Sequence, residues 1–194
     1  MSTSSPTSTP DQHPPRAAPG RLPAAIGLVL LLCLPAVFIA RISQVTNPHL
    51  LGPGDPIPAL TAKDLASNEI YHVDFTTLPV ALLLFSTECS HCQRELTRFD
   101  RLSKQFGDRI LFLAVSVSSK TKTTELIRAD HPEVRILLDD EKNVQQGLGV
   151  DVVPALFLVG TDGAIAYSGS GEKSFASREK LLSEFVNSIR STRN

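Results

Sequence analysis

The stretch Val80-Ala81-Leu82-Leu83-Leu84-Phe85 runs into Ser86-Thr87-Glu88-Cys89-Ser90-His91-Cys92, and this junction decides the fold. Its first six residues are all apolar, which predicts a short strand covered on both faces of its sheet. Beyond the second cysteine, apolar residues recur at helical spacing on a polar background, at Leu96, Phe99 and Phe106. The two cysteines therefore lie where a buried strand gives way to an amphipathic helix.

Two cysteines at such a junction are suited to thiol–disulfide chemistry. A helix N-terminus stabilises an anion through its unpaired backbone N–H groups and its dipole, so the pKa of the Cys89 thiol should be lowered. A gap of two residues lets the sulfur of Cys92 reach a mixed disulfide formed on Cys89. His91, if protonated, would add positive charge beside the thiolate and make the disulfide more oxidising. We assign Cys89 as the attacking nucleophile and Cys92 as the resolving thiol.

Other interpretations of this cysteine pair stay open from the residues alone. A zinc site needs two further ligands, but the chain has no second cysteine pair and its other histidines are scattered. A purely structural disulfide would not explain a position at the tip of a helix. His91 could also be a solvated residue of the helix tip that takes no part in the chemistry.

The residues after this helix predict the rest of an α/β sandwich with a mixed sheet. Short apolar runs predict strands, and amphipathic spacing predicts helices. Thr161-Asp162-Gly163 between two apolar runs is typical of a hairpin. The predicted strands cover 110–117, 134–138, 155–159 and 164–167, and the predicted helices cover 121–130, 141–147 and 181–189. Strand–helix–strand followed by hairpin and helix is the order expected of this architecture.

The bulk composition excludes several classes of function. The chain has 194 residues and a formal net charge of −1, so no overall field favours nucleic acid or an acidic partner. Lys and Arg are dispersed without aromatic residues between them, unlike a nucleic-acid-binding surface. Three cysteines are too few for a small protein held together by disulfides. One redox-active domain with appendages fits this composition.

The N-terminal quarter predicts a membrane anchor in front of that domain. Residues 1–21 are rich in Ser, Thr, Pro and Ala, which predicts a disordered tail. Residues 22–40 carry no charged side chain and approach the ~20 residues with which a helix crosses a bilayer. Residues 41–54 contain several prolines and glycines, which predict a semi-rigid linker. The folded domain that carries the cysteine pair is then expected over residues 55–191.

The apolar segment allows competing interpretations. A cleaved signal peptide usually has an apolar region of about 7–15 residues, and no clean cleavage site precedes Arg41. A lipoprotein signal ending at Cys33 is disfavoured because Leu31 and Leu32 precede it. A buried soluble helix would show a polar face. More positive charge before the segment than after it favours a single-pass anchor in the cell membrane, with the catalytic domain extracytoplasmic, on the periplasmic side.

Three motifs together resemble the thioredoxin superfamily, and within it the membrane-anchored TlpA/ResA-like oxidoreductases with a redoxin (AhpC/TSA-like) domain. They are residues 52–60, the segment from Phe85 to Cys92, and residues 149–158 with the sequence Gly-Val-Asp-Val-Val-Pro-Ala-Leu-Phe-Leu. The resemblance implies a thioredoxin-like three-layer sandwich around a mixed central β-sheet. It also implies that Pro154 is cis and packs against the cysteines, leaving the backbone of Val153 to pair with a substrate peptide.

The resemblance suggests a further role and shows three departures. A glutamate at the position of Glu95 assists proton transfer in such reductases, although a solvated helix carboxylate is an equal alternative. Glu88 stands where the family usually has Trp, and a negative neighbour should disfavour the Cys89 thiolate. Pro is common where His91 stands, and the buried acidic residue of thioredoxins is here Leu83. These changes leave open whether the pair oxidises or reduces its partners.

The resemblance implies a reductase of disulfides in exported proteins, with apocytochrome c thiols as one substrate. Its partners would be protein disulfides or dithiols and a membrane electron donor of the DsbD or CcdA type. No dinucleotide motif predicts a cofactor. A redoxin-type thiol peroxidase is an alternative, but this chain lacks its Pro-x-x-x-Thr-x-x-Cys pattern before Cys89. Leu82 stands at the position of the Pro, and Ser86 stands at the position of the Thr. A Sco-like copper-binding assembly protein is a second alternative, but it normally spaces its cysteines by three. A third alternative is a catalytically inactive thioredoxin fold that only binds a partner, and such a protein would need neither cysteine.

Overall fold

The structure is a computed structural model that describes residues 50–130 and 132–192. Its strands are β1 (Thr61–Asp64), β2 (Ile70–His72), β3 (Val80–Phe85), β4 (Leu111–Ser116), β5 (Arg135–Leu138), β6 (Ala155–Val159) and β7 (Ile165–Ser170). Its helices are α2 (Ser90–Phe106), α3 (Lys120–Asp130), α4 (Asn143–Gly147) and α5 (Phe175–Thr192). The predicted strand at 80–85 and the helix after it are confirmed.

Strand β3 lies inside a seven-stranded sheet with the order β2-β1-β5-β4-β3-β6-β7. It pairs in parallel with β4, from Val80 opposite Leu111 to Phe85 opposite Ser116, and antiparallel with β6. All six of its residues are buried, as an uninterrupted apolar run requires of a strand covered on both faces. The prediction of a mixed sheet is confirmed, and its fully buried strand β3 ends four residues before Cys89.

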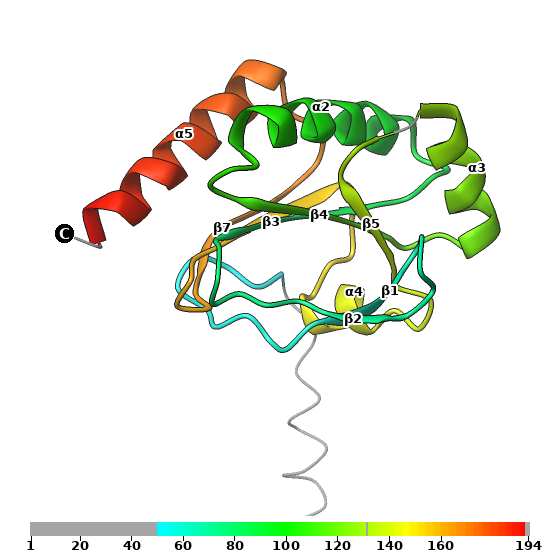
Figure 1. Cartoon of the computed structure of the whole chain (residues 1–194), viewed down its shortest axis with the longest axis horizontal. Helices are drawn as coiled ribbons and strands as arrows, with labels where there is room; N and C mark the ends of the chain where they lie inside the picture. Colours follow the sequence, from blue (N-terminus) through cyan, green and yellow to red (C-terminus); the bar gives the residue numbers. More distant parts are fainter. Residues whose placement is uncertain (1–49, 131, 193–194) are drawn as a thin grey trace, which may run out of the picture. The chain divides into compact units, whose positions relative to one another are not determined.

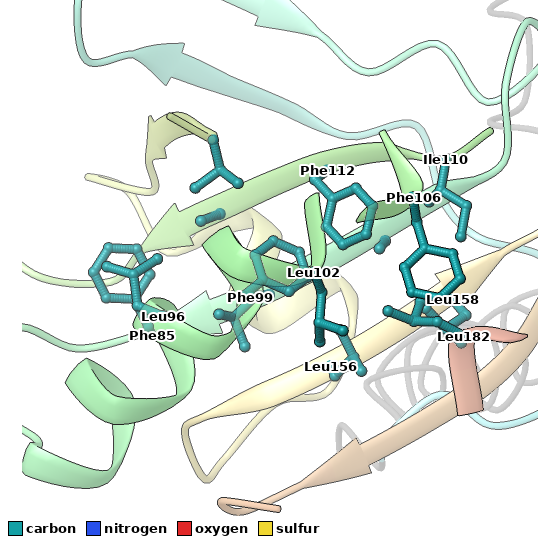
Figure 2. Close-up of a cluster of buried hydrophobic side chains, with 14 of the residues drawn as sticks. Phe85, Leu96, Phe99, Leu102, Phe106, Ile110, Phe112, Leu156, Leu158 and Leu182 are labelled. Atoms are coloured by element: carbon teal, nitrogen blue, oxygen red, sulfur yellow. The ribbon is translucent and has the colours of Figure 1, made fainter. Parts of the chain in front are cut away.

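Helices α2, α3 and α5 cover one face of the sheet (Figure 1). The apolar side of α2 packs onto β3 and β4, where the rings of Phe99 and Phe112 lie 4.9 Å apart between centroids. Figure 2 shows the cluster in which helix and strand side chains meet, including Phe85, Leu96, Phe99, Leu102, Phe106, Ile110, Phe112, Leu156, Leu158 and Leu182. Full burial of one such side chain contributes about 1.5–3 kcal/mol, so this cluster fixes α2 on the sheet.

The opposite face of the sheet is covered by α4 and by the first described residues of the chain. Val144 of α4 and the adjacent Leu148 join a second apolar cluster that includes Leu82 of β3. Leu50 and Leu51 pack against this cluster. Successive side chains of a strand point to opposite faces, so β3 contributes to both clusters. The thioredoxin-like sandwich of three layers is therefore confirmed.

Strands β1 and β2 were not predicted from the sequence. Both are short and lie at one edge of the sheet, and Ile70 of β2 is 58% exposed. Their pairing is set by tertiary contacts, because β1 joins β5 antiparallel with Lys63 opposite Leu138 and Asp64 opposite Leu137. Such edge strands carry little of the apolar periodicity by which a strand is recognised.

The predicted tail and membrane span, residues 1–21 and 22–40, lie outside the described residues. Within 50–130 and 132–192, no helix combines the length and apolar character that a membrane crossing needs. Residues 50–54, the described part of the predicted linker, hydrogen-bond to the domain. The N–H of Leu51 donates to the carbonyl of Leu148 at 3.1 Å, and the N–H of Gly54 donates to that of Ile165 at 2.8 Å.

Candidate active site

Cys89 occupies the N-cap position of α2, shortly after the end of β3. Its backbone is extended, with φ −103° and ψ 111°, and its carbonyl accepts a hydrogen bond from the N–H of Gln93 at 3.1 Å. Its sulfur accepts a hydrogen bond from the backbone N–H of Cys92 at 3.3 Å. The thiol therefore takes the place that a Ser or Asp side chain takes in other helices, at the end of the helix that favours an anion.

The two thiols, which form no disulfide in the structure, differ in exposure and in pKa. Burial raises the pKa of the half-buried Cys89. Hydrogen bonds from the Cys92 thiol and from the backbone N–H groups of Cys92 and His91, with the charge of Arg94, outweigh that effect and lower the pKa below its usual value. Burial and the hydrogen bond to Cys89 raise the pKa of the fully buried Cys92 to about 12. Of the two, Cys89 is therefore the group suited to attack as a thiolate.

The cis-proline loop shares a cavity with His91, which stands between the two cysteines in the sequence. The Val153–Pro154 peptide bond is cis, as the resemblance implied. Val153 packs against the same apolar cluster as Cys89. A cavity of about 650 Å³ opens at this loop, and its lining includes His91, Arg98, Val152, Val153, Pro154 and Glu172. The structure thus brings the two predicted substrate-binding residues together with His91 around one cavity.

The side chain of His91 is exposed and engages an acidic residue that sequence analysis did not single out. Its Nδ1 lies 2.6 Å from Oε2 of Glu172 and 2.9 Å from Nη2 of Arg94. The same glutamate accepts hydrogen bonds from Arg94 and from Arg98. The hydrogen bonds with Arg94, His91 and Arg98 hold the pKa of the Glu172 carboxyl well below its usual range. His91 therefore contacts a cluster of charged side chains at the helix tip, while a part in the chemistry stays a prediction.

Glu95 is buried, with 3% of its side chain exposed, and lies on the face of α2 that carries Cys92. Its Oε1 accepts a hydrogen bond from Nε of Arg178 at 2.5 Å, and Arg178 is equally buried. Its Oε2 accepts one from the backbone N–H of Lys173 at 3.3 Å. The alternative of a solvated helix carboxylate is therefore wrong. The negative charge of Glu95 adds to the raised pKa of Cys92, so the two groups interact, while a role in proton transfer stays a prediction.

Glu88, expected to oppose the thiolate, forms an ion pair of its own. Its Oε1 accepts a hydrogen bond from Nζ of Lys122 at 2.6 Å. The cation that lowers the pKa of Cys89 is Arg94, which sequence analysis missed together with Arg98 and Glu172. Arg94 and Arg98 lie one helical turn apart on α2, a spacing visible in the sequence, but their acidic partner lies more than seventy residues further along the chain.

No cluster of three or more His, Cys, Asp and Glu side chains that could hold a metal ion occurs within the part of the chain that the structure describes. A larger cavity of about 790 Å³ lies between the β1–β2 edge and β5, and it contains none of the predicted site residues. The cysteine pair and the cis-proline loop therefore define the candidate site.

Comparison with protein-family models matches residues 53–168 to the AhpC/TSA family. This range includes the cysteine pair, the cis-proline loop and the sheet that carries both. The chain belongs to the AhpC/TSA family. The predicted recognition, a redoxin domain of the thioredoxin type, is confirmed by this match and by the fold.

Individual proteins and solved structures are similar to this chain over more than half of its length. The chain is 26% identical over 156 residues to the thiol:disulfide interchange protein DsbE of Escherichia coli (strain K12), covering 76% of this chain and 84% of that protein. It is 24% identical over 115 residues to the thioredoxin-like protein YneN of Bacillus subtilis (strain 168), covering 58% of this chain and 68% of that protein. The thioredoxin domain of a thiol-disulfide oxidoreductase from Bacteroides vulgatus matches the fold with a TM-score of 0.63 at 22% identity. This match covers 70% of this chain and 99% of that structure. The predicted enzyme class, a thiol–disulfide oxidoreductase, is confirmed.

The difference between the two thiols predicts a pH-dependent reactivity confined to Cys89. We expect the rate of alkylation by iodoacetamide to rise with pH through a single midpoint below that of a free cysteine, because only the thiolate reacts. Cys92 is fully buried with a pKa of about 12, so it should stay unmodified across the neutral range. Mass spectrometry of the alkylated protein would locate the label. Modification of Cys92 before Cys89 would contradict the assignment.

Proposed function

We propose that this protein reduces disulfide bonds of exported proteins through the dithiol of Cys89 and Cys92, on the extracytoplasmic side of the cell membrane. The observation that carries the proposal is the pairing of a half-buried Cys89 of lowered pKa with a fully buried Cys92 of raised pKa. A substrate can reach only the first sulfur. The second is kept protonated until a mixed disulfide has formed beside it.

The reaction follows from that order. The Cys89 thiolate attacks one sulfur of a substrate disulfide, the substrate S–S bond breaks, and the departing thiolate takes a proton. Cys92 then loses its proton and attacks the sulfur of Cys89, which releases the second substrate thiol. Two electrons pass to the substrate, and the enzyme is left with a Cys89–Cys92 disulfide. A membrane electron donor of the DsbD or CcdA type, acting through its own dithiol, would return the enzyme to the reduced state.

The surrounding residues have roles that fit this sequence of steps. The cavity at Val152, Val153 and Pro154 can accept an extended substrate segment, with the backbone of Val153 as its hydrogen-bonding partner. Glu95 would assist the loss of the proton from Cys92, since the two groups already interact. His91 lies at the rim of the same cavity, where its side chain can contact a bound substrate.

The finer parts of the proposal concern location and substrate. An apolar span at residues 22–40 would hold the domain at the membrane, and the charges around it favour an extracytoplasmic domain. The similarity to a DsbE protein, a thiol:disulfide interchange protein by name, supports protein thiols as partners. Thiols of apocytochrome c are the substrate that we propose to test first.

The reduction potential of the Cys89–Cys92 couple tests the direction of the reaction. The full chain carrying Cys33→Ser would be equilibrated with glutathione buffers, and the fraction of disulfide measured by mass spectrometry after alkylation. We expect a value near that of thioredoxin, about −270 mV, as a reductant requires. A value near that of the oxidant DsbA, about −120 mV, would show that the pair oxidises its partners. Rapid consumption of peroxide by the same protein would favour the thiol peroxidase instead.

Replacement of the resolving thiol should capture substrates on the enzyme. In Cys92→Ser, we expect mixed disulfides through Cys89 to persist, because no second sulfur can displace the bound partner. Gels run with and without reductant would reveal them when a disulfide-containing apocytochrome c peptide is supplied. The double variant Cys89→Ala, Cys92→Ser is the matched control and should capture nothing. Equal capture by both variants would show that the bond does not involve Cys89.

A further inference from the structure

Glu172 gathers three basic side chains beside the cysteine pair. Its carboxylate forms a bidentate ion pair with Arg94, called the fork below. In it, Nε donates to Oε1 at 3.0 Å and Nη2 donates to Oε2 at 2.8 Å. Nη1 of Arg98 donates to Oε1 at 2.5 Å, and Nδ1 of His91 lies 2.6 Å from Oε2. Planar forks of this kind fix the orientation of a guanidinium as well as its position.

The loop that carries Glu172 is itself fastened at both sides. The N–H of Gly171 donates to the carbonyl of Pro154 at 2.7 Å, which ties the loop to the cis-proline segment. The N–H of Lys173 donates to the buried Glu95, and Nη2 of Arg178 donates to the carbonyl of Gly171 at 3.2 Å. The backbone around Glu172 is therefore held in place by contacts that do not involve Arg94.

Arg94 would otherwise be a mobile surface side chain. Half of its side chain is exposed, and its recorded contacts within residues 50–130 and 132–192 are those with Glu172 and His91. A charge on a long, free side chain is screened by water and salt and acts weakly on its neighbours. Nη2 of Arg94 lies 2.9 Å from Nδ1 of His91, the residue directly before Cys92, so the guanidinium stands at the cysteine motif. Hydrogen bonds from Cys92 and His91 make the larger contributions to the lowered pKa of Cys89, and the charge of Arg94 adds to them.

We propose that Glu172 is a positioning residue, which fixes the guanidinium of Arg94 against His91 of the cysteine motif and so makes Arg94 a cation that supports the nucleophile. This inference rests on the proposed function and names a residue pair that acts on the same site. His91 contacts the same carboxylate oxygen, Oε2 of Glu172, as Nη2 of Arg94 does. Arg94, one turn further along α2, supplies the cation that the sequence analysis had sought in His91.

Loss of Glu172 would have two opposing effects on the nucleophile, and their sum separates this proposal from a simple charge effect. Removal of a negative charge near the site should stabilise the Cys89 thiolate. Release of Arg94 into solvent should destabilise it, because a screened and mobile cation acts less strongly. If Glu172 is a positioning residue, the second effect exceeds the first, and it is present only in a protein that contains Arg94.

The rate of Cys89 alkylation by iodoacetamide, measured below the wild-type midpoint, tests the proposal. The full chain carrying Cys33→Ser would be compared with Arg94→Met, Glu172→Gln, the double variant Arg94→Met, Glu172→Gln, and the exposed control Arg101→Met on the same helix. We expect Arg94→Met and Glu172→Gln each to slow the reaction about threefold, because less thiolate is present. In the Arg94→Met protein, Glu172→Gln should cause no further slowing, and Arg101→Met should change nothing.

A second variant separates position from charge. Glu172→Asp keeps the negative charge but shortens the side chain by one methylene, so it should also slow alkylation if the fork with Arg94 matters. Faster alkylation in Glu172→Gln, or slowing by the same factor with and without Arg94, would overturn the proposal. Failure of the inference alone would leave the wild-type chain able to reduce protein disulfides, whereas failure of the proposed function would show as no disulfide exchange by the wild type.

Discussion

Cys89→Ala should lower the rate of disulfide exchange by more than about a thousandfold, because it removes the atom that attacks the substrate. Cys92 cannot replace it. Its sulfur is fully buried, and its pKa of about 12 leaves almost no thiolate at neutral pH. The measurement is the rate at which the full chain reduces a peptide disulfide in the presence of an excess of dithiol.

The third cysteine provides the matched control for this variant. Cys33 lies in the predicted apolar span and is expected to be inert, so Cys33→Ser should retain the wild-type rate. Both variants remove one thiol, which separates the loss of a particular sulfur from the loss of any sulfur. Activity of Cys89→Ala within tenfold of the wild type would show that the nucleophile has been wrongly assigned.

Glu95→Ala should reduce the free energy of unfolding by about 3 kcal/mol, the scale for removing one partner of a buried ion pair. Arg178 would keep its hydrogen bond to the carbonyl of Gly171 but lose its ion pair, because Glu95 is the carboxylate that it contacts within residues 50–130 and 132–192. With 3% of both side chains exposed, water cannot replace that contact. Urea denaturation of the full chain, followed by circular dichroism, would measure the change.

Two companion variants show whether the loss comes from the unpaired charge. Replacement of both partners, in Glu95→Leu, Arg178→Leu, should cost less than Glu95→Ala, because no buried charge is left without a partner. Glu69→Ala removes an exposed carboxylate and should change stability by less than about 0.5 kcal/mol. A smaller loss in Glu95→Ala than in the double variant would contradict this account of the pair.

The centre of the fold could be predicted because its pattern is local. The six apolar residues of β3 and the helical spacing on α2 are signals that tertiary contacts do not override. The β1–β2 edge escaped prediction because its strands are three or four residues long and partly exposed, and the pairing of β1 with β5 is decided by residues far along the chain. Local pattern therefore identifies buried elements better than edge elements.

The same contrast holds at the candidate site. Cys89, His91 and Cys92 lie within four residues, so spacing alone indicated their chemistry. The fork between Arg94 and Glu172 joins a helix to a loop 78 residues later, and neither residue differs in sequence from an ordinary solvated charge. Glu95 was predicted by resemblance, but its burial against Arg178 depends on how α5 packs on α2, which no local pattern describes.

The position of β3 between two partner strands also bears on how the protein opens. Each of its residues from Val80 to Phe85 is buried, and it is paired on one side with β4 and on the other with β6. Amide protons in such a strand exchange with solvent only through the rarest, most global openings. The cysteine pair begins four residues after this strand, so its scaffold should remain closed through each cycle of oxidation and reduction. Hydrogen exchange in β3 should then report the stability of the whole domain, in either redox state.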